Sequence, residues 1–166
     1  MKNIFIIVLL VGGLIFYVSN KDSTPDTLYF SGEQYKLGDA SGKQGMAKTY
    51  QYTKSGRING INDFVHVFVV DKTTDYIDPI RGFLEESYSL SLLDELDGKF
   101  GVFNTSGEQR DYYAYSVEQE TATSYWILTF VNQSNFDNNK VSLGEARNKA
   151  PDYFRSLVAT FNEIAH

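Results

Sequence analysis

The hydrophobic pattern of the chain contains two segments that are apolar on both sides of an extended backbone. The stretch from Phe64 to Val70 is apolar except for His66, and the stretch SYWILTFVNQ at 124–133 is similar. Such a pattern is typical of a central strand in a covered sheet. Shorter segments rich in β-favouring residues predict further strands at 27–30, 33–37, 47–53, 99–103 and 110–119, with a hairpin turn at Ser31-Gly32.

A first helix is predicted between Asp78 and Gly98. Asp78 followed by Pro79 is a typical helix start, because an N-cap acceptor precedes a proline at the first helical position. A glycine such as Gly98 often ends a helix, since it adopts a positive φ without strain. The apolar residues between these limits form a candidate buried stripe: Ile80, Phe83, Leu84, Leu93 and Leu96.

A second helix is predicted after the capping box formed by Ser142 and Glu145. Its apolar residues recur at spacings of three and four, and Pro151 is expected to kink the helix or divide it. The stripe consists of Leu143, Ala146, Ala150, Phe154, Leu157, Phe161 and Ile164. The order of elements predicts one α+β domain at 27–166, with a single antiparallel sheet of about six strands and two main helices packed on it.

An apolar run from Ile4 to Val18, flanked by Lys2 and Lys21, precedes this domain. At about 1.5 Å per residue the run is shorter than the roughly 30 Å hydrocarbon layer, which favours a cleaved signal peptide. The sequence FYVSNKD that follows, however, lacks the small residues of a cleavage site. We therefore expect residues 1–20 to be an uncleaved signal anchor, a transmembrane helix, and residues 21–26 to be a polar tether. An exported soluble protein after cleavage is the alternative.

The charge pattern indicates where the domain lies and what it binds. Positive charge at the extreme N-terminus favours a single-pass topology with the C-terminal domain outside the cytoplasm, in the periplasm. The chain has 15 basic and 21 acidic side chains, a formal net charge of -6, and no cysteine. A negative domain disfavours nucleic acid as a partner and favours a basic protein. The lack of cysteine excludes disulfides, thiolate catalysis and a lipid-modified cysteine anchor.

Two motifs resemble ligand loops but lack required residues. GDASGKQG at 38–45 has the wrong glycine spacing for a phosphate loop, and Gln44 replaces the hydroxyl that would bind magnesium. Asn135, Asp137 and Asn139 alternate like calcium ligands, yet Lys140 replaces the turn glycine. We interpret the first as a surface loop and the second as an Asn-rich turn, and we expect no cofactor and no metal.

No catalytic set follows from the remaining polar residues. His66 is the single histidine within the domain, and a single imidazole does not build a typical zinc site. Its position between Phe64 and Phe68 predicts a side chain of the sheet face or core. The acids Asp71, Asp75 and Asp78 follow the same strand and are interpreted as loop and cap residues. A hydrolase that uses His66 or these acids is the least favoured hypothesis.

Two surfaces are candidates for binding. The first is an acidic set on the first predicted helix, proposed to contact a basic protein: Glu85, Glu86, Asp94, Glu95 and Asp97. The second is an aromatic groove for a peptide or sugar, weighed against ordinary core packing of the same rings: Tyr112, Tyr113, Tyr115 and Trp126.

The favoured functional hypothesis is a membrane-anchored, non-enzymatic interaction domain that binds a protein partner in the cell envelope. Two forms of this hypothesis are an immunity or inhibitor-type protein and an accessory subunit of an envelope complex. A small-ligand or glycan-binding module that uses the aromatic strands is the alternative.

Overall fold

The computed structural model describes residues 25–42, 47–57, 63–93, 97–104, 111–133, 135–136 and 139–165. The predicted transmembrane helix at 1–20, which includes the apolar residues 4–18, lies outside these ranges, as does most of the tether. Within them, no helix is long and apolar enough to cross a membrane.

The main structure is an antiparallel sheet of eight strands in the order β1-β2-β3-β4-β8-β7-β6-β5. A separate two-stranded ribbon pairs β9 with β10. The strands are β1 (Thr27–Phe30), β2 (Glu33–Gly42), β3 (Ala47–Thr53), β4 (Asp63–Asp71), β5 (Ser91–Leu92), β6 (Lys99–Asn104), β7 (Asp111–Glu120), β8 (Ser124–Gln133), β9 (Asn135–Phe136) and β10 (Asn139–Lys140). The α+β class is therefore confirmed, but the expected number of about six strands is too low, because two-residue strands show no hydrophobic period.

The turn between β1 and β2 is the hairpin turn that the sequence predicts. Ser31 and Gly32 both have positive φ, at 52° and 79°, as a two-residue hairpin turn requires.

The expectation of a loop at 38–45 is wrong in its first half, because β2 continues to Gly42. Gly42 has a φ of 144°, and a Cβ there would lie 2.4 Å from the Ala47 carbonyl oxygen. A close backbone approach, not phosphate binding, explains this glycine.

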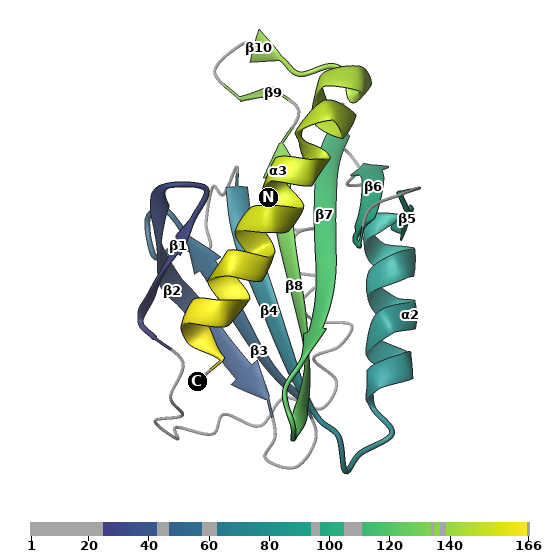
Figure 1. Ribbon diagram of the computed structural model, residues 1–166. Helices are drawn as coiled ribbons and strands as arrows, with labels where there is room; N and C mark the ends of the chain where they lie inside the picture. Colours follow the sequence, from purple (N-terminus) through teal and green to yellow (C-terminus); the bar gives the residue numbers. More distant parts are fainter. Residues whose placement is uncertain are drawn as a thin grey trace.

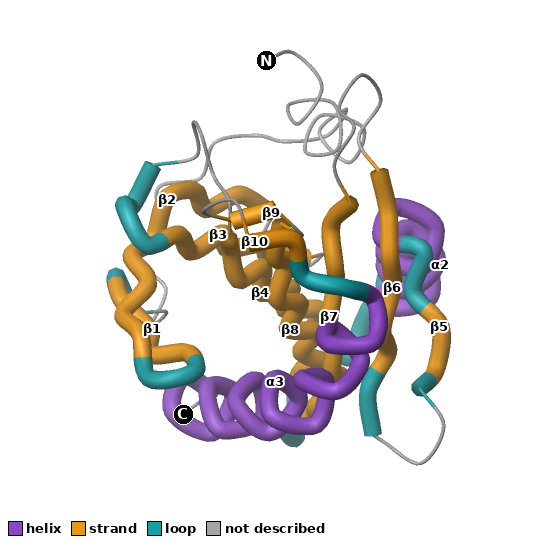
Figure 2. Tube along the Cα trace, turned by 90° about the horizontal axis from the view of Figure 1, so that it is seen from above, coloured by secondary structure: helices purple, strands orange, loops and turns teal. Residues whose placement is uncertain are grey.

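The sheet curls into a half-barrel around the helix α3 (Leu143–Ile164), which crosses its concave face (Figure 2). The predicted capping box is present, with both bonds between Ser142 and Glu145. The helix is not divided at Pro151, contrary to one of the two expected outcomes. Leu143 is exposed, so its inclusion in the buried stripe was wrong, whereas Thr160 is buried. The Thr160 hydroxyl donates a hydrogen bond of 3.0 Å to the Tyr29 carbonyl of the edge strand β1.

The other helix, α2 (Ile77–Tyr88), corresponds to the first predicted helix and packs on the opposite face of the sheet, near β6 (Figure 1). The sheet therefore has a core on each side. The larger core, beneath α3, includes Tyr52, Val65, Tyr115, Leu128 and Leu157. The smaller core, beneath α2, contains Phe68, Leu84, Tyr88, Tyr112, Ala114, Ile127 and Val131.

The predicted limits of the first helix are wrong at both ends. The helix begins one residue before Asp78, whose carboxylate binds Arg81 instead of capping the backbone. The helix ends at Tyr88, because Ser89 takes the left-handed conformation. Gly98 does not end a helix: it is buried, and a Cβ there would lie 2.7 Å from the ring of Phe154 on α3. Contact with α3 therefore requires this glycine.

Candidate interaction site between α2 and the sheet edge

A pocket of about 160 Å³ lies between α2 and the edge of the sheet that is formed by β5 and β6. Its apolar wall comes from Leu84 of α2, Leu90 and Leu92 of the following segment, and Ile127 of β8. Leu92 is also 72 % exposed to solvent. The polar lining residues are Arg81, Glu85, Asp97, Lys99, Ser116 and Glu118. The pocket thus combines an apolar interior with a charged rim.

Two ion pairs hold α2 against the sheet beside this pocket. Arg81 of α2 donates hydrogen bonds from Nε and from a terminal nitrogen to the two carboxylate oxygens of Glu118 on β7. A third bond of 2.7 Å goes to Asp78. The bonds to Glu118 raise the pKa of the Arg81 guanidinium, partial burial opposes this, and Asp78 adds to the increase. The second ion pair joins Lys99 of β6 to Glu85 of α2.

A row of polar side chains crosses the face of the sheet that carries α2 and ends at the pocket. The strand register pairs its members successively across five strands: Gln51, His66, Thr129, Ser116 and Lys99. Paired residues point to the same side of a sheet, so these side chains form one line. Within it, Ser116 and Thr129 are buried and their hydroxyl oxygens lie 2.9 Å apart, within hydrogen-bonding distance. The row is not visible in the sequence, because each of the five strands contributes one residue to it and only the strand register aligns them.

His66 occupies the sheet-face position that the sequence predicts. It lies between Phe64 and Phe68, and its ring centroid is 4.1 Å from that of Phe68. Nδ1 lies 3.5 Å from the Tyr88 hydroxyl, at the long limit of a hydrogen bond. Burial lowers the pKa of His66 to about 3, although part of the side-chain surface remains exposed. Ser116 lies two strands away, at roughly 10 Å given the usual strand spacing, so it does not pair with this imidazole.

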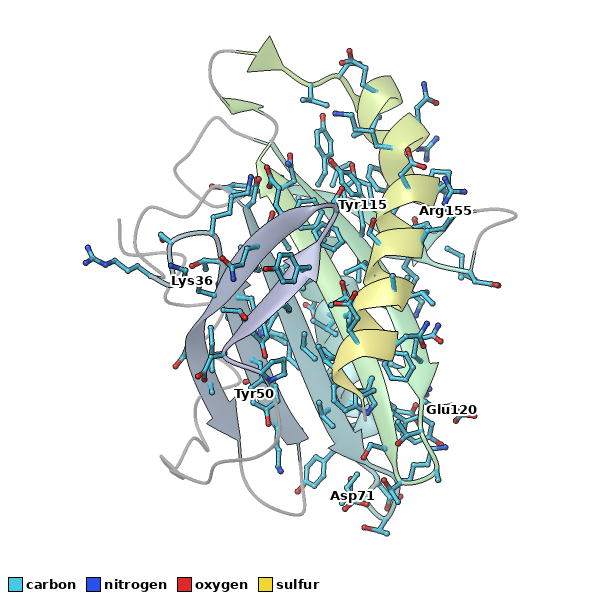
Figure 3. The ribbon with its side chains drawn as sticks, turned by 60° about the vertical axis from the view of Figure 1, so that its left-hand side comes forward. Lys36, Tyr50, Asp71, Tyr115, Glu120 and Arg155 are labelled. Atoms are coloured by element: carbon cyan, nitrogen blue, oxygen red, sulfur yellow. The ribbon has the colours of Figure 1, made fainter. Side chains whose placement is uncertain are left out.

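The three acids after β4 serve different local roles. Asp71 accepts two hydrogen bonds of 2.8 Å, from the backbone N–H and from the hydroxyl of Thr73. These bonds lower the pKa of Asp71. Asp75 is exposed, and Asp78 binds Arg81. Figure 3 shows Asp71 at the same end of the sheet as Glu120, which binds Lys72. Among the described residues, no three His, Asp or Glu side chains form a group that could hold a metal ion.

The predicted acidic set does not form one helix face. Glu85 and Glu86 are exposed on α2, whereas Asp97 is exposed in the turn before β6. Asp94 and Glu95 lie outside the described residues. Since α2 ends at Tyr88, Asp97 does not lie on the helix but directly precedes β6, which is next to the edge strand β5. Glu85 and Asp97 consequently meet at the pocket, where both are lining residues.

The four predicted groove aromatics do not share a surface. Tyr112, Tyr113 and Tyr115 are 5 %, 4 % and 2 % exposed, which makes all three core residues. Tyr112 belongs to the core under α2, and the other two belong to the core under α3. The Tyr115 hydroxyl donates a bond of 3.0 Å to the Ala146 carbonyl, and Figure 3 labels this residue beside α3. Trp126 is partly buried against Phe161, with the ring centroids 5.8 Å apart.

The segment with calcium-like spacing forms a backbone ribbon. Asn139 pairs with Phe136, and Lys140 pairs with Asn135, in antiparallel register. Asp137 lies outside the described residues. The Asn-rich turn is therefore part of a short hairpin that leads into α3.

Known proteins provide no assignment for this site. No protein-family model, curated protein or solved structure matches the chain. No relative therefore supplies a function by similarity.

Proposed function

We propose that this chain is a membrane-tethered, non-enzymatic domain that binds a protein partner outside the cytoplasm. The observation that carries the proposal is the pocket beside α2, with the exposed Leu92 at its rim. Its volume of about 160 Å³ is well below the roughly 300–1,000 Å³ of typical small-molecule sites. An apolar hollow of this size suits a single side chain from another protein, as in the central pockets of protein interfaces.

The chemistry around the pocket also favours binding over catalysis. Arg81 is neutralised by Glu118 and Asp78, and Lys99 is neutralised by Glu85. A catalytic acid or base must exchange protons with a substrate, whereas groups in such pairs are committed to one charge state. His66 faces Tyr88 rather than a nucleophile, so we do not propose a hydrolase.

The aromatic strands provide little support for the alternative of a glycan-binding module. Sugar-binding sites of the kind considered above need exposed rings, and the three tyrosines of β7 are buried. We therefore retain the protein-binding proposal.

The location of the domain is proposed from the apolar run at 4–18 and the missing cleavage site. The tether joins the domain at β1, where the Tyr52 hydroxyl donates a bond of 3.0 Å to the Pro25 carbonyl. The Leu37 N–H donates a bond of 2.8 Å to the Asp26 carbonyl at the same place. β1 and β5 are opposite edges of the sheet, so the pocket lies away from the tether attachment. This arrangement supports access of a partner from the periplasm.

Site-specific photo-cross-linking in native cells tests the binding proposal. A photoreactive amino acid at Leu92 should give a discrete cross-link to one other protein. The same group at Leu143, a 50 % exposed leucine at the start of α3, is the matched control. Cross-links that are absent from both positions, or equal at both, would contradict the proposal.

Membrane retention needs a separate experiment. The intact chain, still beginning at its N-terminal segment, should remain in the membrane fraction after a carbonate wash. A mature protein that begins near Asn20 and is released as a soluble species would instead support the signal-peptide alternative.

A further inference from the structure

The pocket beside α2 also indicates the chemistry of its occupant, an inference that rests on the proposed function. We propose that the pocket receives one leucine- or phenylalanine-sized side chain of a partner polypeptide, and that carboxylates at its rim select a lysine or arginine next to that side chain.

The size of the occupant follows from the volume. Apolar cavities of roughly 150 Å³ lined by leucine, isoleucine and phenylalanine hold one benzene molecule. The present pocket of about 160 Å³ has Leu84, Leu90 and Ile127 in its lining. One branched aliphatic or aromatic side chain therefore fits, and a second does not. The exposed Leu92 extends the apolar contact beyond the mouth of the pocket.

The walls are held in place before any partner arrives. Arg81–Glu118 connects α2 to β7, and Glu85–Lys99 connects α2 to β6. In each pair the positive and the negative group neutralise one another. An apolar side chain that binds between the pairs therefore leaves no charged group without its partner. Ordered polar residues around an apolar centre exclude water from the contact, which is the usual arrangement at strong interface positions.

The preference for a basic neighbour follows from the charge that remains. The lining contains the bases Arg81 and Lys99 and the acids Glu85, Asp97 and Glu118. Asp97 is exposed and makes no ion pair with another described residue. A cation beside the anchoring side chain would meet this carboxylate, whereas an anion would meet an acidic rim on a chain of net charge -6.

The test uses a random linear peptide library displayed on phage and selected against the purified full-length protein. Selected peptides should share an apolar residue of leucine or phenylalanine size directly beside lysine or arginine. Synthetic peptides of the selected sequence should lose at least about tenfold in affinity for Leu92→Asp and for Asp97→Lys. Both positions are exposed, so the variants should fold, and an unchanged unfolding midpoint will verify this.

Matched controls place the same chemical changes elsewhere. Leu143→Asp repeats the leucine change, and Glu163→Lys repeats the charge reversal at an exposed site on α3. Neither control should alter peptide affinity. If no peptide is enriched, if the motif lacks either component, or if the Leu92 and Asp97 variants bind normally, the inference is overturned.

Two further outcomes separate this inference from the proposed function. Concentration-dependent dimers that are lost in Leu92→Asp would identify a second copy of the chain as the occupant, and would overturn the inference. A cellular partner that cross-links from Leu92 but binds Asp97→Lys normally would overturn the basic-neighbour preference while the proposed function stands. If the photoreactive group at Leu92 gives no cross-link to any cellular protein, that result instead counts against the proposed function.

Discussion

The contact between β6 and the end of α2 yields a sharp prediction about two glycines. An ideal Cβ on Gly101 would lie 2.1 Å from the Tyr88 carbonyl oxygen and 2.8 Å from that of Ser89. An ideal Cβ on Gly82, within α2, would meet nothing within 4 Å. The same substitution, glycine to alanine, should therefore have opposite effects at the two positions.

The magnitudes follow from the geometry. In Gly101→Ala the contact must lengthen by about 0.9 Å, from 2.1 Å to the 3.0 Å that real Cβ atoms require. Because the opposing atoms are backbone, the end of α2 must shift with Tyr88, at a cost of about 1–3 kcal/mol for overpacking. In Gly82→Ala the methyl group occupies open space, and better helix propensity should stabilise the fold by about 0.5–1 kcal/mol.

Urea denaturation monitored by the fluorescence of Trp126, the only tryptophan, measures both effects. The free energies of unfolding of the two variants should differ by about 1.5–4 kcal/mol, with unchanged m-values for Gly82→Ala. Equal stability of the two variants would refute the proposed packing of α2 against β6, and with it the geometry of the pocket.

Three further predictions concern individual side chains. Thr160→Val should destabilise the fold by about 1–2 kcal/mol in urea denaturation, since it removes the hydroxyl that lies within hydrogen-bonding distance of the Tyr29 and Ser156 carbonyls, whereas Thr160→Ser should retain most of the stability. Ser142→Ala should cost about 1 kcal/mol, because it removes the acceptor for the Glu145 N–H, and Ser142→Asp should recover most of the loss; equal effects of both would contradict the cap. Because burial lowers the pKa of His66 in the folded state, the unfolded chain binds a proton first as the pH falls below 6.5. The free energy of unfolding should therefore decrease between pH 6.5 and pH 5 by no more than about 1.4 kcal/mol per pH unit, and His66→Phe should remove this component of the pH dependence.

Sequence motifs of a few residues correctly predicted those elements whose ends are determined by contacts between residues close together in the chain. The capping box at Ser142 begins α3 because both of its hydrogen bonds join residues three apart in the chain. The Ser31-Gly32 turn formed as predicted for a similar reason, since two residues with positive φ close the hairpin. The two-sided strands β4 and β8 were identified as central by their apolar residues, and they do pair with each other.

The first helix shows where local signals fail. Gly98 resembled a helix end, yet its lack of a side chain serves the contact with Phe154 on α3. The actual end at Tyr88 depends on Gly101, which leaves room for the helix carbonyls against β6. Neither contact is visible in sequence, because each joins elements that are separated in the chain.

The acidic and aromatic candidates show the same limitation. The sequence grouped Glu85 with Asp97 on one helix, whereas the structure brings both to one pocket from two elements, α2 and the turn before β6. The tyrosines of β7 alternate between two faces, and both faces are covered. Composition alone does not distinguish a buried ring from an exposed one.

By itself, the sequence determined the α+β class, the central strands, the hairpin and the capped C-terminal helix, because periodicity and caps act within a few residues. The tertiary structure decided the curl around α3, the length of α2, the polar row on the face that carries it and the pocket at the sheet edge. These features depend on β8 pairing beside β4 and on the resulting register across five strands. Register is a long-range property, set by how the two faces of the sheet bury their apolar residues against different helices.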